Sequence, residues 1–206
     1  MYKVIKHPLI KVKLSVMRDK KTSSRDFRSN LVELTQFMAF EVTKDLKVDS
    51  IKIKTPLATA EGFKLKDDVV LVPILRAGLG MVDGFRNMLP SAPVGFIGLY
   101  RDEKTLKPIK YYDKMPDCIK GSIVLLLDPM LATGYSSAAA ITMLKTYKPK
   151  QIKFVCILSS PEGLKIVEKA HPDIEIYTAC VDKQLNDQGY IVPGLGDAGD
   201  RIFKTK

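Results

Sequence analysis

The 206-residue chain has no tryptophan, two histidines and three cysteines, Cys118, Cys156 and Cys180. An odd number of widely spaced cysteines gives no disulfide framework, and two of them lie in apolar strand-like runs, so we expect reduced thiols in a cytoplasmic protein. No apolar run approaches the roughly 20 residues that a membrane-spanning helix needs. The opening MYKVIKHPLIKVKL carries charges every few positions, which argues against a signal peptide. We therefore expect a soluble protein.

Motifs of several enzyme classes are also missing from the chain. No G-x-x-x-x-G-K-[ST] string occurs, which disfavours a nucleoside kinase. His7 and His171 stand apart from any cysteine, serine or acid pattern that would indicate a metal site or a catalytic triad. We interpret His7 as part of the terminal segment and His171 as a helix-end residue, because Pro172 follows it.

Positive charge is in excess: 33 lysines and arginines against 23 aspartates and glutamates give a formal charge of +10. Residues 1–25 hold eight of the basic residues and a single acid, Asp19. Such a field attracts anions, either nucleic acid or small polyphosphates. A lysine-rich solvated surface is an equally good interpretation, because the basic residues are not interleaved with aromatic ones.

Strand-like and helix-like segments alternate along the chain. Apolar runs predict strands at 69–75, 93–100, 122–128, 152–158 and 174–181, and an alternating edge strand near 51–57. Helical periodicity covers residues 24–46, with Ser23 or Ser24 as the cap, and residues 77–89, 136–147 and 161–170. Repeated β-α-β units predict one α/β domain over residues 1–206. Its mainly parallel sheet is flanked by helices, and ligands bind at the carboxyl ends of the strands.

The strongest local signal is IVLLLDPMLATGYSSAAA at residues 123–140, where a buried strand ends in Asp128 and a small-residue turn opens directly into a helix. Amides of residues 132–136 and the hydroxyls of Thr133 and Ser136 can surround a phosphate at the positive helix end. Asp128 can accept hydrogen bonds from ribose hydroxyls. A capped strand-to-helix connection without any ligand uses the same residue types, so these types alone leave both interpretations open.

The full string is more specific, because LLLDPMLATGYSS resembles the phosphoribosyl-diphosphate motif of type I phosphoribosyltransferases, in the form typical of the uracil phosphoribosyltransferase family. LVPILRAGLGM at 71–81 and GYIVPGLGDAGDRIF at 189–203 resemble the same family. Shorter matches are KHPLI at 6–10, LYRDEKTLKPIKYY at 99–112 and PEG at 161–163, so the likeness spans nearly the whole chain. The chain departs from the family at Tyr135 and Lys204, where glycine is usual. A positive φ at Tyr135 would strain the phosphate turn.

The resemblance implies the type I phosphoribosyltransferase fold, with a projecting lid hairpin at about 101–117 and a small hood from the terminal segments. The hood includes a uracil-binding segment at about 189–203. The implied reaction transfers the phosphoribosyl group of phosphoribosyl diphosphate to uracil and gives UMP and diphosphate, in pyrimidine salvage. Mg²⁺ is implied as a bridge between substrate oxygens, without direct protein ligands. A homodimer or homotetramer, and GTP as an effector in some members, are implied as well.

The resemblance also assigns residues to the two substrates. The phosphoribosyl diphosphate site consists of Arg76, Ala77, Gly78, Arg101, Asp128, Pro129, Met130, Leu131, Ala132, Thr133, Gly134, Tyr135, Ser136 and Asp197. The uracil site consists of Ile191, Gly196, Asp197 and Ala198, whose main chain faces the base and discriminates against the amino group of cytosine.

Three of these residues are assigned to catalysis: Arg76, Arg101 and Asp197. Arg76 and Arg101 supply positive charge to the leaving pyrophosphate. We hypothesise that Asp197 deprotonates or orients the uracil nitrogen, because it is the one ionisable side chain in the glycine-rich core of its segment.

Two rival functions stay open at the level of sequence. An RNA-binding regulator built on the same fold would use the basic surface, although the carboxyl-terminal uracil segment argues against nucleic acid as the partner. A sibling enzyme for orotate or a purine would keep the phosphoribosyl motif and differ in its base site.

Overall fold

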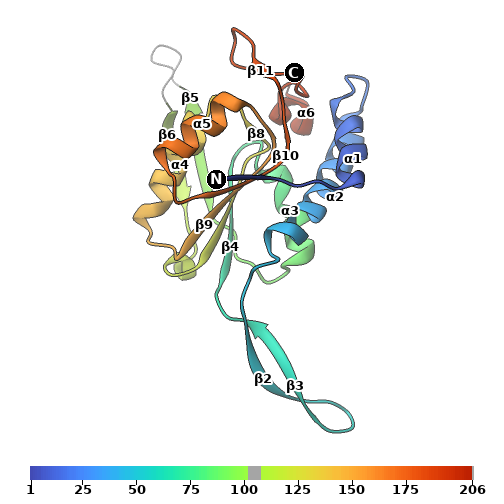
Figure 1. Cartoon of the computed structure of the whole chain (residues 1–206), viewed down its shortest axis with the longest axis vertical. Coiled ribbons are helices and arrows are strands. Elements are labelled where there is room, and N and C mark those ends of the chain that lie inside the picture. Colours follow the sequence, from blue (N-terminus) through green and yellow to red (C-terminus); the bar gives the residue numbers. More distant parts are fainter. Residues whose placement is uncertain (102–107, 206) are drawn as a thin grey trace.

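The computed structural model describes residues 1–101 and 108–205. Its main sheet consists of β1 (Tyr2–Val4), β4 (Val69–Leu75), β5 (Phe96–Arg101), β6 (Pro108–Lys114), β7 (Ile123–Leu127), β8 (Met130–Leu131), β9 (Gln151–Ser159) and β10 (Glu175–Val181). The strand order is β1-β10-β9-β7-β4-β5-β6, with β8 beside β9 (Figure 1). The strand pairs are parallel apart from β5 and β6, which confirms the predicted mainly parallel sheet.

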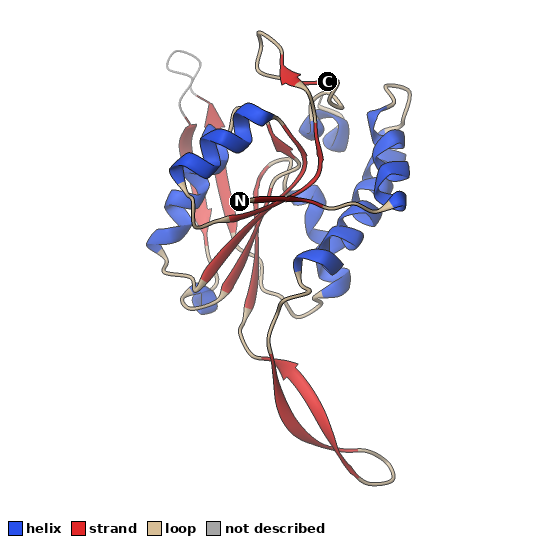
Figure 2. Cartoon of the chain, in the orientation of Figure 1, coloured by secondary structure: helices blue, strands red, loops and turns tan. Residues whose placement is uncertain are grey.

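Helices cover both faces of this sheet (Figure 2). One face carries α1 (Pro8–Arg18), α2 (Ser24–Val42), α3 (Leu79–Met88) and α6 (Ala198–Phe203), and the other carries α4 (Tyr135–Thr146) and α5 (Pro161–Ala170). In β7, Leu125 faces the first layer and Leu126 the second. Strands buried on both faces need apolar side chains at every position, which is why the central strands are continuous apolar runs.

Caps account for where the helices begin and end. The Ser23 hydroxyl accepts a hydrogen bond from the Asp26 N–H at 3.1 Å, so Ser23 is the cap of α2. The helix ends at Val42, four residues before the predicted end. Helix α5 has the predicted bounds, and the N–H of His171 donates to the carbonyl of Val167 at 2.8 Å where the helix ends.

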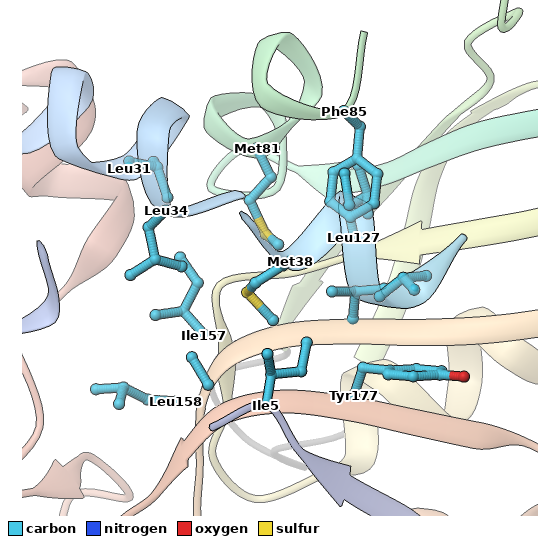
Figure 3. Packing of buried hydrophobic residues seen from close by; sticks show 14 of the residues in the cluster. Ile5, Leu31, Leu34, Met38, Met81, Phe85, Leu127, Ile157, Leu158 and Tyr177 are labelled. Carbon is cyan, nitrogen blue, oxygen red and sulfur yellow. The ribbon is translucent and has the colours of Figure 1, made fainter. Parts of the chain in front are cut away.

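The core beneath α2 and α3 holds large side chains from elements far apart in the sequence. Figure 3 shows Met81 of α3 pointing toward Met38 of α2, whose side chain points in turn toward Ile5 of the amino-terminal segment. Met38 and Met81 have no exposed surface. Close packing of this kind ties α2 and α3 to the sheet and leaves little room for the helices to shift.

A buried lysine is less expected. Lys153 lies in β9 with a fully buried side chain, within the mostly apolar run IKFVCIL that predicted the strand. Its Nζ donates to the Val42 carbonyl at 2.9 Å and pairs with Asp45. The lysine thereby gives a hydrogen-bond donor to a backbone carbonyl in the last turn of α2, and its positive charge interacts favourably with the carboxyl end of the helix.

Residues 48–65 form an arm that stands away from the sheet (Figure 1). β2 (Val48–Lys54) and β3 (Thr59–Leu65) pair antiparallel in a two-stranded sheet of their own. The edge strand predicted near 51–57 exists, but it belongs to this hairpin, and β3 was not predicted. Alternation of apolar and charged residues is the same in an edge strand and in a free hairpin, so the pattern could not separate the two.

The carboxyl edge of the sheet carries the lid and hood regions. β5 and β6 pair antiparallel in the region of the hairpin predicted at about 101–117, and the 3₁₀ turn Asp117–Ile119 begins where that predicted lid ends. Residues 102–107 of that lid lie outside the described residues. The hood combines α1, α6 and the short pair β11 (Gln184–Leu185) and β12 (Ile191–Val192). Among the described residues, no helix is both long and apolar enough to cross a bilayer.

We predict that Met38→Ala lowers the free energy of unfolding by about 2–5 kcal/mol, because it leaves a cavity at the centre of the core. Phe40→Ala is the matched control, since Phe40 lies on the same helix with its side chain 60% exposed. It should cost about 0.5 kcal/mol or less. Denaturant unfolding of both variants measures the difference, and equal losses would contradict the proposed packing.

Candidate active site

A pocket of about 310 Å³ opens where β4 and β7 end and the hood covers the sheet edge. Its described lining consists of Ala77, Asp128, Met130, Ala132, Gln188, Gly189, Tyr190, Ile191, Gly196, Asp197, Ala198 and Gly199. Cavities of about 450 and 550 Å³ lie at the root of the arm and beside α5. The described lining of these two cavities contains no residue of the three longest matching strings, at 71–81, 123–140 and 189–203, so the smaller pocket is the candidate site.

The phosphate turn runs from Asp128 into α4. Gly134 has φ +81°, and a Cβ there would lie 2.7 Å from the Gly163 carbonyl, so only glycine fits. Tyr135 follows as the first residue of α4, with its side chain 54% exposed. The positive φ thus falls on Gly134, and the strain considered for Tyr135 does not arise. The amides of the first turn of α4 are left at the open end of the helix, where they can meet an anion.

Ser160, the N-cap of α5, supports this turn. Its buried hydroxyl donates to the Ala132 carbonyl at 2.6 Å and accepts from the Gly163 N–H at 2.8 Å. The N–H of Ser160 donates to the Leu131 carbonyl at 3.0 Å. Sequence reasoning missed Ser160, although the PEG match begins at the residue that follows it.

Asp128 is the electrostatic centre of the pocket. It follows the last residue of β7, and its Oδ1 accepts a hydrogen bond of 3.3 Å from the Met130 N–H. Burial raises the pKa of Asp128 from 3.8 to about 7, and the negative charge of Asp197 adds to the rise, while the Met130 hydrogen bond opposes it. The carboxylate, which accepts this hydrogen bond from the Met130 N–H, therefore gains from any hydroxyl or cation that enters the pocket.

The turn after β4 approaches Asp128 closely. A Cβ on Gly78 would lie 2.3 Å from the Leu127 carbonyl, so glycine is needed for the two strand ends to pack together. Ala77 lines the pocket, and the peptide bond before Arg76 is cis. The Arg76 guanidinium is outside the lining, 3.7 Å from an Asp200 carboxylate oxygen and 5.9 Å from the centre of the Phe203 ring. With 57% of its side chain exposed, Arg76 stays accessible at the pocket rim.

The tail brings Ile191 and residues 196–199 into the lining of the pocket. Asp197 caps α6, where its Oδ1 accepts a hydrogen bond from the Asp200 N–H at 2.9 Å. One of its carboxylate oxygens is engaged in this way, and the residue remains exposed to the pocket. Asp197 therefore has a structural role in addition to any role toward a ligand.

The pocket gathers about half of the residues that the sequence assigned. Those in the lining are Ala77, Asp128, Met130, Ala132, Ile191, Gly196, Asp197 and Ala198. Those placed near it but outside the lining are Arg76, Gly78, Pro129, Leu131, Thr133, Gly134, Tyr135 and Ser136. Pro129 and Leu131 have buried side chains, which leaves only their backbone for a ligand. The backbone of Arg101 ends β5, and its side chain lies outside the described residues.

Gln188, Gly189, Tyr190 and Gly199 line the pocket without having been assigned. The last three lie within GYIVPGLGDAGDRIF, so the matching string was the signal that could have found them. Within the described ranges, no three His, Cys, Asp or Glu residues group as metal ligands. The walls thus offer two carboxylates, a helix start and a main chain rich in glycine.

Comparison with known proteins gives one consistent family. Residues 4–205 match the family model described as uracil phosphoribosyltransferase. A protein of that name from Malacoplasma penetrans (strain HF-2) is 58% identical over 203 residues, which cover 98% of either chain. The structure of the AQ2163 protein from Aquifex aeolicus is similar at a TM-score of 0.95 and 40% identity, covering 100% of this chain and 99% of that one.

A hypoxanthine-guanine phosphoribosyltransferase from Bacillus anthracis str. 'Ames Ancestor' covers 78% of this chain and 79% of its own. Its TM-score is 0.53 and its identity 17%, so this likeness concerns the fold alone. The type I phosphoribosyltransferase fold that the sequence motifs predicted is thereby confirmed.

The raised pKa of Asp128 predicts a gain in stability when its charge is removed. A carboxyl with a folded-state pKa of about 7 stabilises the folded state while protonated and loses that contribution as pH rises through 7. In ligand-free protein, Asp128→Asn should therefore raise Tm at pH 8 by roughly 3 °C or more, with an effect that shrinks as the pH falls toward 4.

Asp113→Asn is the control of opposite sign, because the hydrogen bond from Tyr147 holds the pKa of Asp113 below its ordinary value. That variant should not raise Tm at pH 8. Thermal unfolding followed by circular dichroism between pH 4 and 8 measures both. A lower Tm for Asp128→Asn at pH 8 would contradict the electrostatic account of the pocket.

Proposed function

This chain belongs to the uracil phosphoribosyltransferase family, and from that premise we propose that the pocket between Asp128 and Asp197 holds its two substrates. The enzyme transfers the phosphoribosyl group of phosphoribosyl diphosphate to uracil, which forms UMP in pyrimidine salvage. The observation that carries the proposal is the meeting of two distant segments. Residues from the segments 128–132 and 188–199 line one cavity, which suits a sugar phosphate joined to a base.

The phosphate turn is proposed to bind the ribose 5-phosphate. Amides of residues 132–136 at the start of α4 point toward the anion, and the positive end of the helix dipole favours its charge. Asp128 accepts hydrogen bonds from the ribose hydroxyls. These bonds replace the water that burial removed, so ligand binding should relieve the unfavourable state of the Asp128 carboxylate.

The turn at 76–78 is proposed to bind the diphosphate. As the bond to the leaving group breaks, positive charge develops on the sugar and negative charge on the diphosphate. Arg76 can supply a cation there once its guanidinium exchanges Asp200 for the ligand, and Ala77 and Gly78 allow close backbone approach. Arg101 is proposed to close over the same group from the lid.

The tail is proposed to bind uracil. Backbone groups of Ile191, Gly196 and Ala198 can pair with its amide and carbonyl edges, and the same pairing would leave the amino group of cytosine without an acceptor. Asp197 would orient the reacting nitrogen or take its proton while keeping its cap on α6.

Mg²⁺ fits this site as a substrate-bound ion. The described residues offer no cluster of three ligands, and Mg²⁺ commonly keeps several waters and binds phosphate oxygens. The carboxylates of Asp128 and Asp197 on the pocket walls could accept hydrogen bonds from those waters. The ion would neutralise charge on the diphosphate as it leaves.

Self-association is proposed to use the arm. A hairpin without further strands is at best marginally stable, yet Val48, Phe63 and Leu65 on one face of the arm are 54%, 65% and 43% exposed. Covering that face with a second copy of the chain would remove this apolar surface from water. Activation by GTP and location in the cytoplasm stay predictions.

The role of Asp197 predicts the first activity test. With labelled uracil, phosphoribosyl diphosphate and Mg²⁺, wild-type protein should form UMP, and Asp197→Asn should lower kcat by about 100-fold or more. Because asparagine also caps helices, Asp197→Asn should keep the wild-type Tm, whereas Asp197→Ala should lose about 1 kcal/mol of stability. Near wild-type turnover in Asp197→Asn would remove Asp197 from catalysis.

The arm predicts a second test by light scattering. Wild-type protein should have two or four times the 23.0 kDa mass of one chain, and Phe63→Glu should lower that mass. Tyr111→Glu is the matched control, because Tyr111 is another exposed aromatic residue on a hairpin strand, 55% exposed. It belongs to β6 of the main sheet, whereas the arm is a two-stranded sheet of its own. A wild-type mass of one chain would refute the assembly.

A further inference from the structure

Arg18, at the end of α1, clasps the turn that forms the base side of the pocket. Its Nη1 donates to an Asp182 carboxylate oxygen at 2.8 Å and to the Gly194 carbonyl at 2.7 Å. Its Nη2 donates to the other Asp182 oxygen at 2.6 Å. The Gly194 N–H completes the ring by donating to Asp182 at 2.9 Å. Both backbone groups of Gly194 are thereby bound to one ion pair.

Gly194 controls the shape of the turn that starts at Ile191. It has φ +60°, and a Cβ at this position would lie 2.1 Å from the Ile191 carbonyl. Ile191 is 5% exposed and lines the pocket. The backbone of Gly194 therefore lies close against the Ile191 carbonyl, so we expect a shift of Gly194 to displace this carbonyl, which belongs to the main chain proposed to bind the base.

The ion pair is built to hold its geometry. The Arg18 side chain is 23% exposed and that of Asp182 is 5% exposed. Burial alone would raise the pKa of Asp182, but the hydrogen bonds from Arg18 and Gly194 outweigh it and hold that pKa below its ordinary value. A bidentate pair of this kind fixes orientation as well as charge.

A second arginine joins the same elements from the other side. Arg201 of α6 donates to the Leu195 carbonyl at 3.0 Å and to the Asp19 carbonyl at 2.7 Å, and it also contacts the Met17 carbonyl. The carboxyl end of α1 is thus joined to the tail by two arginines: Arg18 binds the Gly194 carbonyl, and Arg201 binds the carbonyls of Met17, Asp19 and Leu195. This end of α1 contributes no residue to the pocket lining.

We infer that Arg18 is a positioning residue for uracil, which sets the base-binding turn at Ile191 through Asp182 and Gly194. The inference rests on the proposed function, because it takes uracil to bind against residues 191–198. Loss of the clasp would let the turn relax and weaken base binding, while the phosphate turn at 128–136 has its own support from Ser160. The effect should therefore fall on uracil and spare phosphoribosyl diphosphate.

Steady-state kinetics separate this role from a general loss of stability. Arg18→Met should raise KM for uracil about tenfold, equivalent to about 1.4 kcal/mol, with KM for phosphoribosyl diphosphate and kcat within about threefold of wild type. Arg18→Lys, which keeps the charge but not the bidentate geometry, should give an intermediate KM for uracil. Measurements are made at a temperature where circular dichroism shows every variant folded.

Arg28→Met is the matched control, because Arg28 also joins an amino-terminal helix to the tail through one carbonyl, that of Ile202 at 2.8 Å. It should lower Tm without a selective rise in KM for uracil. If Arg18→Met does not fold, Arg18→Lys decides the question. A KM for uracil within twofold of wild type, or an equal rise in both KM values, would overturn the inference.

Ala198→Val tests the uracil position separately, since Ala198 lines the pocket itself. A raised KM for uracil in Ala198→Val together with an unchanged KM in Arg18→Met would refute the positioning role and keep the proposed base site. An unchanged KM for uracil in Ala198→Val would refute the base site, and the inference with it.

Discussion

The close packing of the carboxyl end of β7 between two other turns is the constraint on which the site depends. Gly78 lets the turn after β4 lie against the Leu127 carbonyl, and Ser160 holds the Ala132 carbonyl from the far side. Asp128 lies between these contacts, and its burial raises its pKa to about 7. The fold thus holds a carboxylate in surroundings that favour its neutral form until a ligand supplies donors. Such a site lowers the stability of the ligand-free protein and regains that stability when substrate binds. This is the common trade-off between stability and activity.

The base side of the pocket depends on the opposite ends of the chain. Residues 188–199 have little regular structure, so their shape comes from arginines in neighbouring helices, above all Arg18 and Arg201. This assigns a structural task to part of the basic excess. Lys3 and Lys13 likewise pair with Glu175 and Glu33. Part of the amino-terminal positive charge that suggested an anion-binding surface is therefore paired with carboxylates of the same protein. This pairing weakens the interpretation of that surface as a nucleic-acid site.

The sequence predicted the parts of the fold that long apolar runs specify. Strand β4 and helix α5 have their predicted bounds, whereas β7 ends at Leu127, one residue before the predicted end at Asp128. The resemblance to the family assigned Ala77, Asp128 and Asp197 to substrate binding, and all three residues line one pocket. Interactions between residues far apart in the sequence could not be predicted from local patterns. Neither Lys153 under α2 nor the Arg18 clasp has a local pattern, because each pairs with residues more than 100 positions away. The hairpin of the arm was not predicted for another reason: its alternation of apolar and charged residues also occurs in the edge strands of larger sheets.

The central claim is that one pocket holds a sugar phosphate at the start of α4 and a pyrimidine at the tail. A crystal structure of the protein soaked with UMP tests it most directly. The account predicts the phosphate against the amides of residues 132–136, the ribose hydroxyls beside Asp128 and the base against the main chain of residues 191–198. A nucleotide bound elsewhere, or one in this pocket with its phosphate remote from α4, would contradict the account.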